Sequence, residues 1–370
     1  MSRALFVIGG FGLGNSTRCD ALIKELISQG ISVDVATSAN GQWYFTDAEH
    51  IDNLYSLKAL SYSQGKNGIS FLKTLLNFPK LIKNLFSNAF SILKLQRINN
   101  YSFIATDSEY SPFLIKFLLL TPLVTINNVF FTFSDAIKNS PQTRLLKFWP
   151  SLFVEYLDFI IQKNISDYQI APVLKQVNSP SNDRTLYCPP LVRKELHKNI
   201  SSKNMKRALV IASGSGIGVS NKTVDNIAKN KNISELYVAG LTGQSTNKVK
   251  YLGRIKDISG FMNNSDFIVS NGGYSTLSEA LVCRKKILLI PIENHFEQIQ
   301  NSEFIEALGL GFITSDEKIE TDINKLSLMT EVNEEHTKLD GARIAASALA
   351  SLSRSNKFKS TFNERLPTNC

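Results

Sequence analysis

Short apolar runs alternate with amphipathic stretches along most of the chain, a pattern typical of parallel strands covered by helices. The first run, residues 4–8, leads into a glycine-rich stretch at residues 9–14. A segment with apolar residues at helical spacing then ends at Gly30, and a second apolar run spans residues 31–36. This order predicts a βαβ unit that opens a doubly wound domain.

The alternation continues and divides the chain into two such domains. Further strands are predicted at residues 103–106, 123–126 and 168–172, the last being taken as the final strand of the first domain. Prolines, followed by a run rich in Lys, Asn and Ser, indicate a linker. We therefore predict an α/β protein of two doubly wound, Rossmann-like domains that face a central cleft. The expected division is a first domain at 1–188, a linker at 189–206, a second domain at 207–338, and a C-terminal helix with a mobile tail at 339–370.

One stretch of the second domain, residues 270–279, has the composition of an anion site. Gly272 and Gly273 lie between a predicted strand and a predicted helix. Glycines let the backbone approach a ligand, and a helix N-terminus directs N–H groups and a positive dipole toward an anion such as a diphosphate. Thr276 and Glu279 also fit a capping box with Thr276 as the N-cap. Glu279 therefore has two interpretations, helix capping or a hydrogen bond to a ribose hydroxyl.

Two further loops of the second domain also follow predicted strands. Residues 213–218 are rich in glycine and serine, and residues 293–301 combine carboxylates with amides. The carboxyl ends of parallel strands meet at one edge of a sheet. We therefore expect these two loops and residues 271–276 to converge on one pocket. Lys222 is misplaced for a nucleotide-binding P-loop.

The glycine-rich loop of the first domain does not fit a nicotinamide-binding fingerprint. Asn15 stands where the third glycine is required, and Asp34 lies inside the second strand rather than at its end. Asp107 and Glu109 directly follow the predicted strand at 103–106. Carboxylates in that place are candidates for a general base, or they cap the next helix.

Positive charge is concentrated in one part of the first domain. The chain has a net charge of +9, and from Asn53 to Thr106 it contains lysines and an arginine but no Asp or Glu. Apolar residues at helical spacing predict two helices within residues 70–97, divided near Pro79. A basic amphipathic segment such as 58–97 either lies on anionic lipid or packs its apolar face on the sheet. No recognised nucleic-acid-binding motif accompanies the charge, so nucleic acid is not an expected partner.

The four cysteines are scattered and lack metal-ligand spacing, which predicts neither a disulfide framework nor a zinc site and favours a cytoplasmic protein. The apolar N-terminus is too short for a signal peptide. The longest apolar region, residues 113–126, is broken by Lys116 and Pro122 and falls short of a membrane span.

The motifs form an ordered set: a glycine loop opening each domain, Ser-Asn-Gly-Gly-x-Ser-Thr-x-x-Glu at 270–279, Pro291, and Phe-Glu-Gln-x-x-Asn at 296–301. This set resembles the GT-B glycosyltransferases of the MurG-like, family 28 type, strongly over residues 208–312 and weakly in the first domain. The resemblance implies an inverting transferase that needs no metal and no cofactor. It moves a sugar from a nucleotide sugar, expected to be a UDP-sugar, to a lipid-linked or cell-envelope acceptor. The absence of any Asp-x-Asp pair agrees with metal independence.

The resemblance also implies roles for individual residues. The second domain would bind the donor, with Glu279 on the ribose, Glu297 and Gln298 on the sugar, and Asn301 supporting that loop. The expected donor-binding residues are Gly214, Ser215, Gly216, Asn271, Gly272, Gly273, Ser275, Thr276, Glu279, His295, Glu297, Gln298 and Asn301. The first domain would bind the acceptor through a loop that includes Gly12, Gly14, Asn15 and Arg18.

The sequence departs from the family's pattern at the position expected to hold the catalytic base. Related first loops commonly carry His where this chain has Asn15, and an amide cannot serve as a base. Asp107 is the first substitute and Glu109 the second. Two alternatives stay open: a nucleotide-sugar hydrolase or epimerase of the same fold, and a non-catalytic subunit that binds the donor or anchors a transferase complex, which this departure motivates. Peripheral contact with the inner face of an anionic membrane is expected through residues 58–97.

Overall fold

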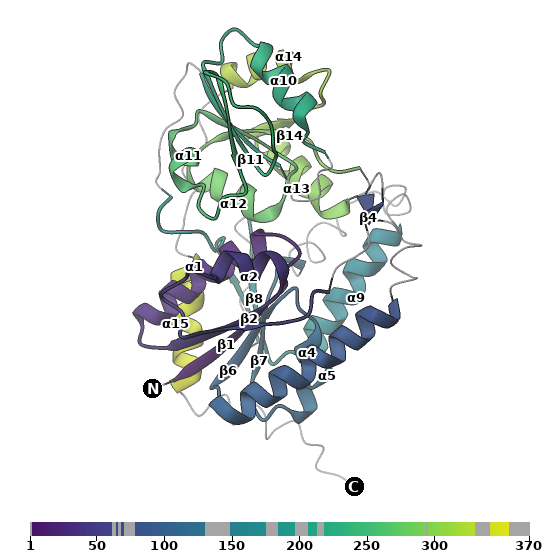
Figure 1. Ribbon diagram of the computed structural model, residues 1–370, viewed down its shortest axis with the longest axis vertical. Coiled ribbons are helices and arrows are strands. Elements are labelled where there is room, and N and C mark those ends of the chain that lie inside the picture. Colours follow the sequence, from purple (N-terminus) through teal and green to yellow (C-terminus); the bar gives the residue numbers. More distant parts are fainter. Residues whose placement is uncertain are drawn as a thin grey trace.

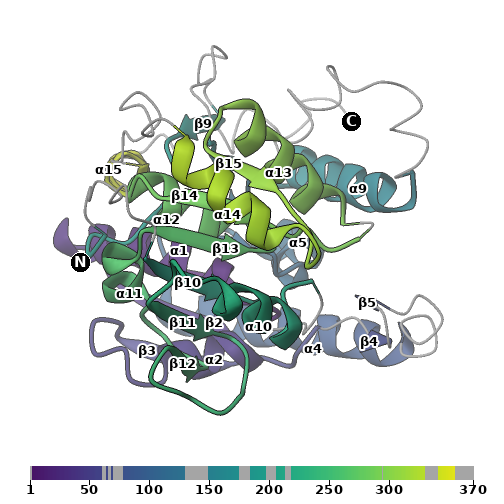
Figure 2. The ribbon, with the colours of Figure 1, turned by 90° about the horizontal axis from the view of Figure 1, so that it is seen from above.

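The computed structural model contains two α/β domains, stacked one above the other (Figure 1). It describes residues 2–60, 64–65, 68–69, 78–129, 149–174, 184–196, 206–212, 218–293, 295–329 and 341–354. Viewed from above, the second domain lies over the strands of the first (Figure 2).

The first domain is built on a parallel sheet of seven strands in the order β3-β2-β1-β6-β7-β8-β9. In chain order they are β1 Arg3–Ile8, β2 Ser32–Thr37, β3 Asn53–Ser56, β6 Phe103–Asp107, β7 Leu123–Ile126, β8 Tyr168–Pro172 and β9 Thr185–Cys188. β1 and β6 are buried along most of their length, as expected for a sheet covered on both faces. A short antiparallel pair, β4 Gln64–Gly65 and β5 Gly68–Ile69, lies outside this sheet.

Helices cover both faces of this sheet. They are α1 Gly14–Ser28, α2 Ala39–Phe45, α4 Phe78–Asn99, α5 Ser111–Leu114, the 3-10 turn η1 Lys116–Leu118, and α9 Trp149–Ile165. α1 and α2 contribute to the apolar core on one face, and α4, α5 and the end of α9 contribute to the core on the other.

The second domain repeats this plan with a parallel sheet of six strands in the order β12-β11-β10-β13-β14-β15. The strands are β10 Arg207–Ile211, β11 Glu235–Ala239, β12 Val249–Gly253, β13 Phe267–Ser270, β14 Lys286–Leu289 and β15 Gly311–Ile313. The helices are α10 Asn221–Lys229, α11 Ser259–Asn264, α12 Tyr274–Val282, α13 Phe296–Ala307 and α14 Ile319–Leu328. α11, α12 and α13 pack on one face, and α10 and α14 pack on the other. The predicted fold class of two doubly wound sheets is confirmed.

Several elements differ from the sequence prediction. β8 is not the last strand of the first domain, because β9 pairs with it in parallel. β3, α2 and α9 were not predicted, and β3 is a half-exposed edge strand without a long apolar run. α4 begins at Phe78, so Pro79 occupies its first turn, where a missing N–H costs little. Residues 70–77 of the predicted 70–97 helical region lie outside the described residues, as does the tail beyond residue 354.

The last described helix, α15 Gly341–Arg354, returns to the first domain. It lies beside α1, although the two helices are at opposite ends of the chain (Figure 1). Ala345, Ala346 and Leu349 are fully buried within the core that α1 and β1 share. Small side chains along one face let α15 approach α1 closely, so the C-terminal helix completes the first domain.

Leu349→Ala is expected to destabilise the first domain by about 2–5 kcal/mol, because it leaves a cavity in a buried apolar core. Ile344→Ala on the same helix is the matched control, since Ile344 is 39% exposed and its truncation leaves no closed cavity. Urea denaturation followed by circular dichroism measures both. Equal losses for the two variants would contradict the packing of α15 described here.

Candidate functional site

A cavity of about 720 Å³ lies between the two domains, at the carboxyl ends of both sheets. The first domain contributes the glycine loop, the loop after β6, the loop after β7, and α9. The second domain contributes the ends of β10, β11 and β13, the first turns of α12, and the start of α13. Two loops expected to converge, those around residues 271–276 and 293–301, do meet here. Residues 213–217, and with them Gly214, Ser215 and Gly216, lie outside the described residues.

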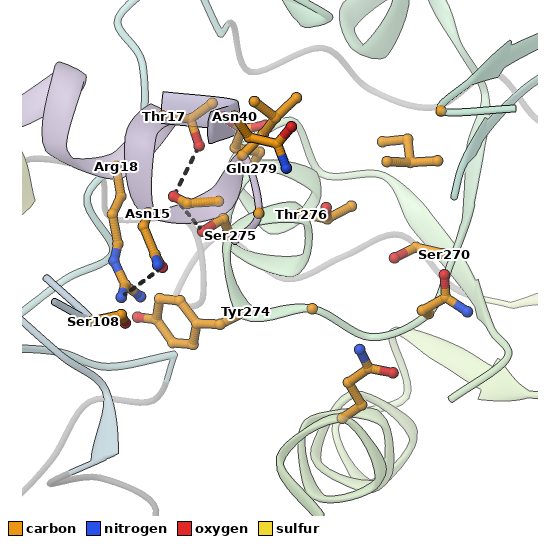
Figure 3. Close-up of a pocket in the computed structure, with 18 of the residues that line it drawn as sticks. Asn15, Thr17, Arg18, Asn40, Ser108, Ser270, Tyr274, Ser275, Thr276 and Glu279 are labelled. Carbon is orange, nitrogen blue, oxygen red and sulfur yellow. Dashed lines mark hydrogen bonds between the residues drawn. The ribbon is translucent and has the colours of Figure 1, made fainter. Parts of the chain in front are cut away.

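The N-terminus of α12 opens onto the cavity. The helix begins at Tyr274 with Gly273 as its N-cap residue, and no side chain caps it. The capping box with Thr276 as N-cap is therefore wrong, because the helix starts before Thr276. Ser275 and Thr276 lie in the first turn and line the cavity (Figure 3). Backbone N–H groups of a first turn lack partners within the helix, and the dipole gives this end a partial positive charge, so the cavity can hold an anion here.

Gly272 holds the loop in front of α12 in a shape that other residues rarely adopt. Its φ is +84°, and a Cβ atom built there would lie 2.5 Å from Ser302 Oγ and 3.0 Å from the Gln298 carbonyl oxygen. Asn301 Nδ2 donates to the Gly272 carbonyl at 3.3 Å, and Asn271 Nδ2 donates to the Ile290 carbonyl at 2.9 Å. Gly272 and Asn301 do not line the cavity themselves but fix the loop that does.

Glu279 is held by an arginine from the interdomain linker. Arg193 Nε and Nη2 each donate to one carboxylate oxygen of Glu279 at 2.8 Å, and both side chains are buried. Arg193 also pairs with Asp257 at 2.9 Å. Burial lowers the pKa of Arg193, but the Glu279 carboxylate outweighs burial and raises it overall. Both Arg193 and Glu279 line the cavity, so Glu279 is fixed in place while oxygen lone pairs remain for a ligand hydroxyl.

The start of α13 contributes further polar groups. Glu297 and Gln298 line the cavity, and Gln298 Oε1 accepts the Ile292 N–H at 3.0 Å. Asn128 of the first domain donates to Glu297 Oε1 at 3.1 Å, across the gap between the domains. His295 precedes α13 as its N-cap residue but is not among the residues that line the cavity.

The first domain faces α12 with the N-terminus of α1. Ser275 Oγ donates to the Gly14 carbonyl at 3.0 Å, and a Cβ atom on Gly14 would lie 2.9 Å from Ser275 Oγ (Figure 3). Gly12, Gly14, Asn15 and Arg18 all line the cavity, as expected for the acceptor-side loop. Arg18 Nη2 also donates to Asn15 Oδ1 at 3.2 Å, which orients the asparagine.

Asp107 is engaged by Arg18 rather than facing the cavity. Arg18 Nε and Nη2 donate to the two carboxylate oxygens of Asp107, each at 2.6 Å, and both side chains are buried. Burial lowers the pKa of Arg18, yet the Asp107 charge raises it overall. Both oxygens of Asp107 are committed to this bidentate pair, and Asp107 does not line the cavity, so it is not presented to an acceptor there. The structure therefore does not support Asp107 as the base.

Glu109 also lies away from the cavity. Its Oε1 accepts the Ser111 hydroxyl at 2.7 Å and the Ser111 N–H at 3.3 Å, at the start of α5. Burial raises the pKa of Glu109, although these hydrogen bonds oppose the change. The arrangement fits the alternative interpretation, in which the carboxylate ties down the next helix.

The sequence analysis missed several residues that line the cavity. From the first domain these are Asn40, Ser108, Tyr110, Asn127, Asn128, Glu155 and Asp158, and from the linker and second domain Arg193, Arg254, Lys256 and Tyr274. Asn127 and Asn128 follow β7, so their position at a strand end was a usable signal. Glu155 and Asp158 lie on α9, which was not predicted as a helix, and no local motif marks them.

Two cations of the second domain close one side of the cavity against α2. The Arg254 guanidinium lies 4.0 Å from the centre of the Trp43 ring, and Arg254 Nη2 donates to Asn40 Oδ1 at 2.5 Å. Lys256 Nζ pairs with Asp47 at 2.7 Å. These contacts link the two domains, and both cationic side chains line the cavity. Among the described residues no group of three or more His, Cys, Asp or Glu side chains is placed to hold a metal ion.

The sequence model of glycosyl transferase family 1 matches residues 2–329. The chain belongs to this family. An uncharacterized glycosyltransferase of Methanosarcina mazei is 26% identical over 335 residues, covering 85% of this chain and 86% of the relative. The UDP-N-acetylglucosamine–N-acetylmuramyl-(pentapeptide) pyrophosphoryl-undecaprenol N-acetylglucosamine transferase of Legionella pneumophila is 24% identical over 351 residues, covering 87% of each chain.

Solved structures place the glycosyltransferase in the GT-B fold. MurG of Acinetobacter baumannii superposes with a TM-score of 0.57 at 14% identity, covering 96% of this chain and 99% of that one. The kitacinnamycin glycotransferase gives a TM-score of 0.57 at 13% identity, covering 97% and 98%. The predicted GT-B fold and MurG likeness are confirmed, while the matching family model carries the family 1 name.

Arg193→Met is expected to lower the free energy of unfolding by about 3–5 kcal/mol, because it leaves the buried Glu279 carboxylate without its partner. Adding Glu279→Gln to that variant removes the unpaired charge and restores part of the loss. Lys194→Met is the control, since the side chain of Lys194 is 67% exposed and its pair with Glu25 contributes about 1 kcal/mol or less. Urea denaturation of the parent and the three variants measures these free energies of unfolding. Equal losses for Arg193→Met and Lys194→Met would contradict the buried pair.

Proposed function

We propose that the protein is an inverting, metal-independent glycosyltransferase that moves a sugar from a UDP-sugar to a lipid-linked or cell-envelope acceptor at the inner face of a membrane. The main observation in favour of a nucleotide-sugar donor is the uncapped N-terminus of α12, which opens onto the interdomain cavity. Arg18, Arg254 and Lys256 line the same cavity. A helix N-terminus with cations around it suits a diphosphate that gains negative charge as the sugar leaves.

The remaining groups suit the other parts of a nucleotide sugar. Glu279 can accept a ribose hydroxyl on the lone pairs that Arg193 leaves unused. Glu297 and Gln298 stand where sugar hydroxyls can bind, on the side of the cavity that faces the first domain. Backbone amides and side-chain cations can stabilise the leaving diphosphate without a metal. The Legionella relative is by its name a transferase of N-acetylglucosamine from a UDP-sugar, which supports a uridine donor here.

A panel of nucleotide sugars tested by thermal shift measures the donor. The matching UDP-sugar is expected to raise the melting temperature, since a ligand at 100 times its dissociation constant stabilises by about 2.7 kcal/mol. Thr276→Asp should abolish the shift, because it places a negative charge where the diphosphate binds. Thr242→Asp, at an exposed threonine of the same domain, should not. A shift that survives Thr276→Asp would contradict this donor site, and UDP release that needs no acceptor would favour a hydrolase.

The proposed contact with a membrane is supported by exposed apolar side chains that lie near basic side chains. On α4, Phe78, Ile82, Phe86 and Phe90 recur every four residues and are exposed, and Lys80 and Lys83 lie between them. Phe117, Leu118 and Leu120, and the α9 residues Phe153, Val154, Tyr156 and Leu157, are exposed as well. Both α4 and α9 run along one flank of the first domain (Figure 1). None of the helices in the described part of the chain is long and apolar enough to cross a bilayer.

Vesicles of phosphatidylcholine with added phosphatidylglycerol test this surface by cosedimentation at low salt. The parent protein is expected to bind, and the double variant Phe86→Ser/Phe90→Ser to bind at least several-fold less, because each Phe contributes buried apolar area in the interface. Leu328→Ser removes an exposed apolar side chain of the second domain and should bind like the parent. A parent that stays in the supernatant would contradict membrane contact and leave the donor site unaffected.

A further inference from the structure

Two carboxylates of α9 reach the cavity from the first domain. Glu155 and Asp158 are three residues apart, so they share one face of the helix, and both line the cavity. Asp107 and Glu109 do not line it. Among the described residues of the first domain, α9 therefore supplies the carboxylates that face the donor side.

The two carboxylates have different surroundings. Asp158 accepts hydrogen bonds from Gln162 Nε2 at 2.7 Å and from Asn127 Nδ2 at 3.4 Å. Burial raises the pKa of Asp158, and the hydrogen bonds from Gln162 and Tyr110 oppose this change. Within the described part of the chain, Glu155 has no such donor. Asp158 is thus fixed by its neighbours, whereas Glu155 can turn toward a ligand.

Glu155 lies where the two domains meet. Burial, then the negative charges of Glu297 and Asp158, raise the pKa of Glu155 to about 8. Glu297 belongs to the second domain and is a proposed sugar-binding residue, and Asn128 of the first domain donates to it. Glu155 and Glu297 line the same cavity, which brings Glu155 to the side where the sugar is expected and where an acceptor hydroxyl has to meet the anomeric carbon.

An independent feature shows that this part of the cavity is built for a polar ligand. The Tyr274 side chain is 5% exposed, and its hydroxyl makes no hydrogen bond of good geometry among the described residues, although the Ser278 hydroxyl lies near it. Figure 3 shows this hydroxyl pointing toward Asn15, Arg18 and Ser108, on the first-domain side of the cavity. A buried hydroxyl without a partner is costly, so a ligand group is expected to bind it.

We propose that Glu155 is the general base of the transfer, an inference that rests on the proposed function. The acceptor O–H bond breaks, and its proton moves to the Glu155 carboxylate. The acceptor oxygen forms a bond to the anomeric carbon of the donor sugar. The bond between that carbon and the diphosphate oxygen breaks, and its electron pair leaves with UDP. Water then removes the proton from Glu155 after the products leave.

Glu155→Gln tests the proposal through UDP release, measured with the UDP-sugar selected by thermal shift. Polyprenyl-diphosphate N-acetylglucosamine in detergent serves as one acceptor and water alone as the other, because a base acts on the hydroxyl of either. The variant is expected to lose about 10²–10⁴-fold in kcat, the range for removal of a general base, and to keep the donor's thermal shift. Glu49→Gln, at an exposed carboxylate of the same domain, should keep both.

The pH profile separates a base from a structural residue. A base works when ionised, so kcat/KM of the parent should rise with pH and level off above about 8. Glu155→Gln should lose this rise, and Glu155→Asp should keep it at reduced kcat, which holds even if the Gln variant folds poorly. Asp158→Asn should move the rise to lower pH, because one of the charges that raise the Glu155 pKa is removed.

The possible outcomes separate the role of Glu155 as the base from the proposed glycosyltransferase function. A parent that releases UDP while Glu155→Gln releases it equally fast, or with the same pH rise, overturns the base alone. A parent that binds a UDP-sugar but releases no UDP to acceptor or water overturns the transferase, and Glu155 as its base falls with it. A parent that binds no nucleotide sugar overturns the donor site as well.

Discussion

Two helix N-termini of like polarity meet at the centre of this molecule. The first turn of α12 contacts the first turn of α1 through the bond from Ser275 Oγ to the Gly14 carbonyl. Each helix start carries a partial positive charge, so their approach is unfavourable unless something compensates it. The nearby guanidinium groups of Arg18 and Arg193 add little to this charge, because Asp107 and Glu279 pair with them. What remains open to the cavity is the uncapped start of α12 with Arg254 and Lys256 in the same lining, and this local positive end is the physical basis for assigning it a nucleotide diphosphate.

The buried ion pairs explain why similar carboxylates take different roles. Asp107 and Glu279 each face a guanidinium with both oxygens, so each is held in one orientation. Glu155 instead has a raised pKa, caused first by burial and then by repulsion from Glu297 and Asp158, so it favours a bound proton. Environment rather than residue type thus divides the acidic groups around this cavity into anchors and a proton acceptor.

Much of the architecture follows from local pattern. The β1–α1–β2 unit, the Gly272-Gly273 turn before α12 and the polar start of α13 were all predictable, because apolar runs, glycines and helix signals are encoded within a few residues of one another. The partner of Glu279 was not predictable, since Arg193 lies 86 residues earlier in a segment with the composition of a linker.

The start of α12 was misplaced for a related reason. Thr276 looks like a cap in the sequence, but the loop geometry imposed by Gly272 lets the helix begin at Tyr274. α9 was missed because its sequence is apolar on most sides and gives no clean helical period.

The return of α15 to the first domain makes the second domain an insertion. The chain crosses from the first domain to the second after β9, and it crosses back before α15. Two connections constrain the relative motion of the domains more than one connection does. A second connection opposes twisting of one domain about the first connection. Bending about the line that joins the two connections remains possible. Opening of the cleft to admit a donor is therefore expected to be a one-axis hinge movement. A single proteolytic cut in either crossing would leave the two domains tethered by the other.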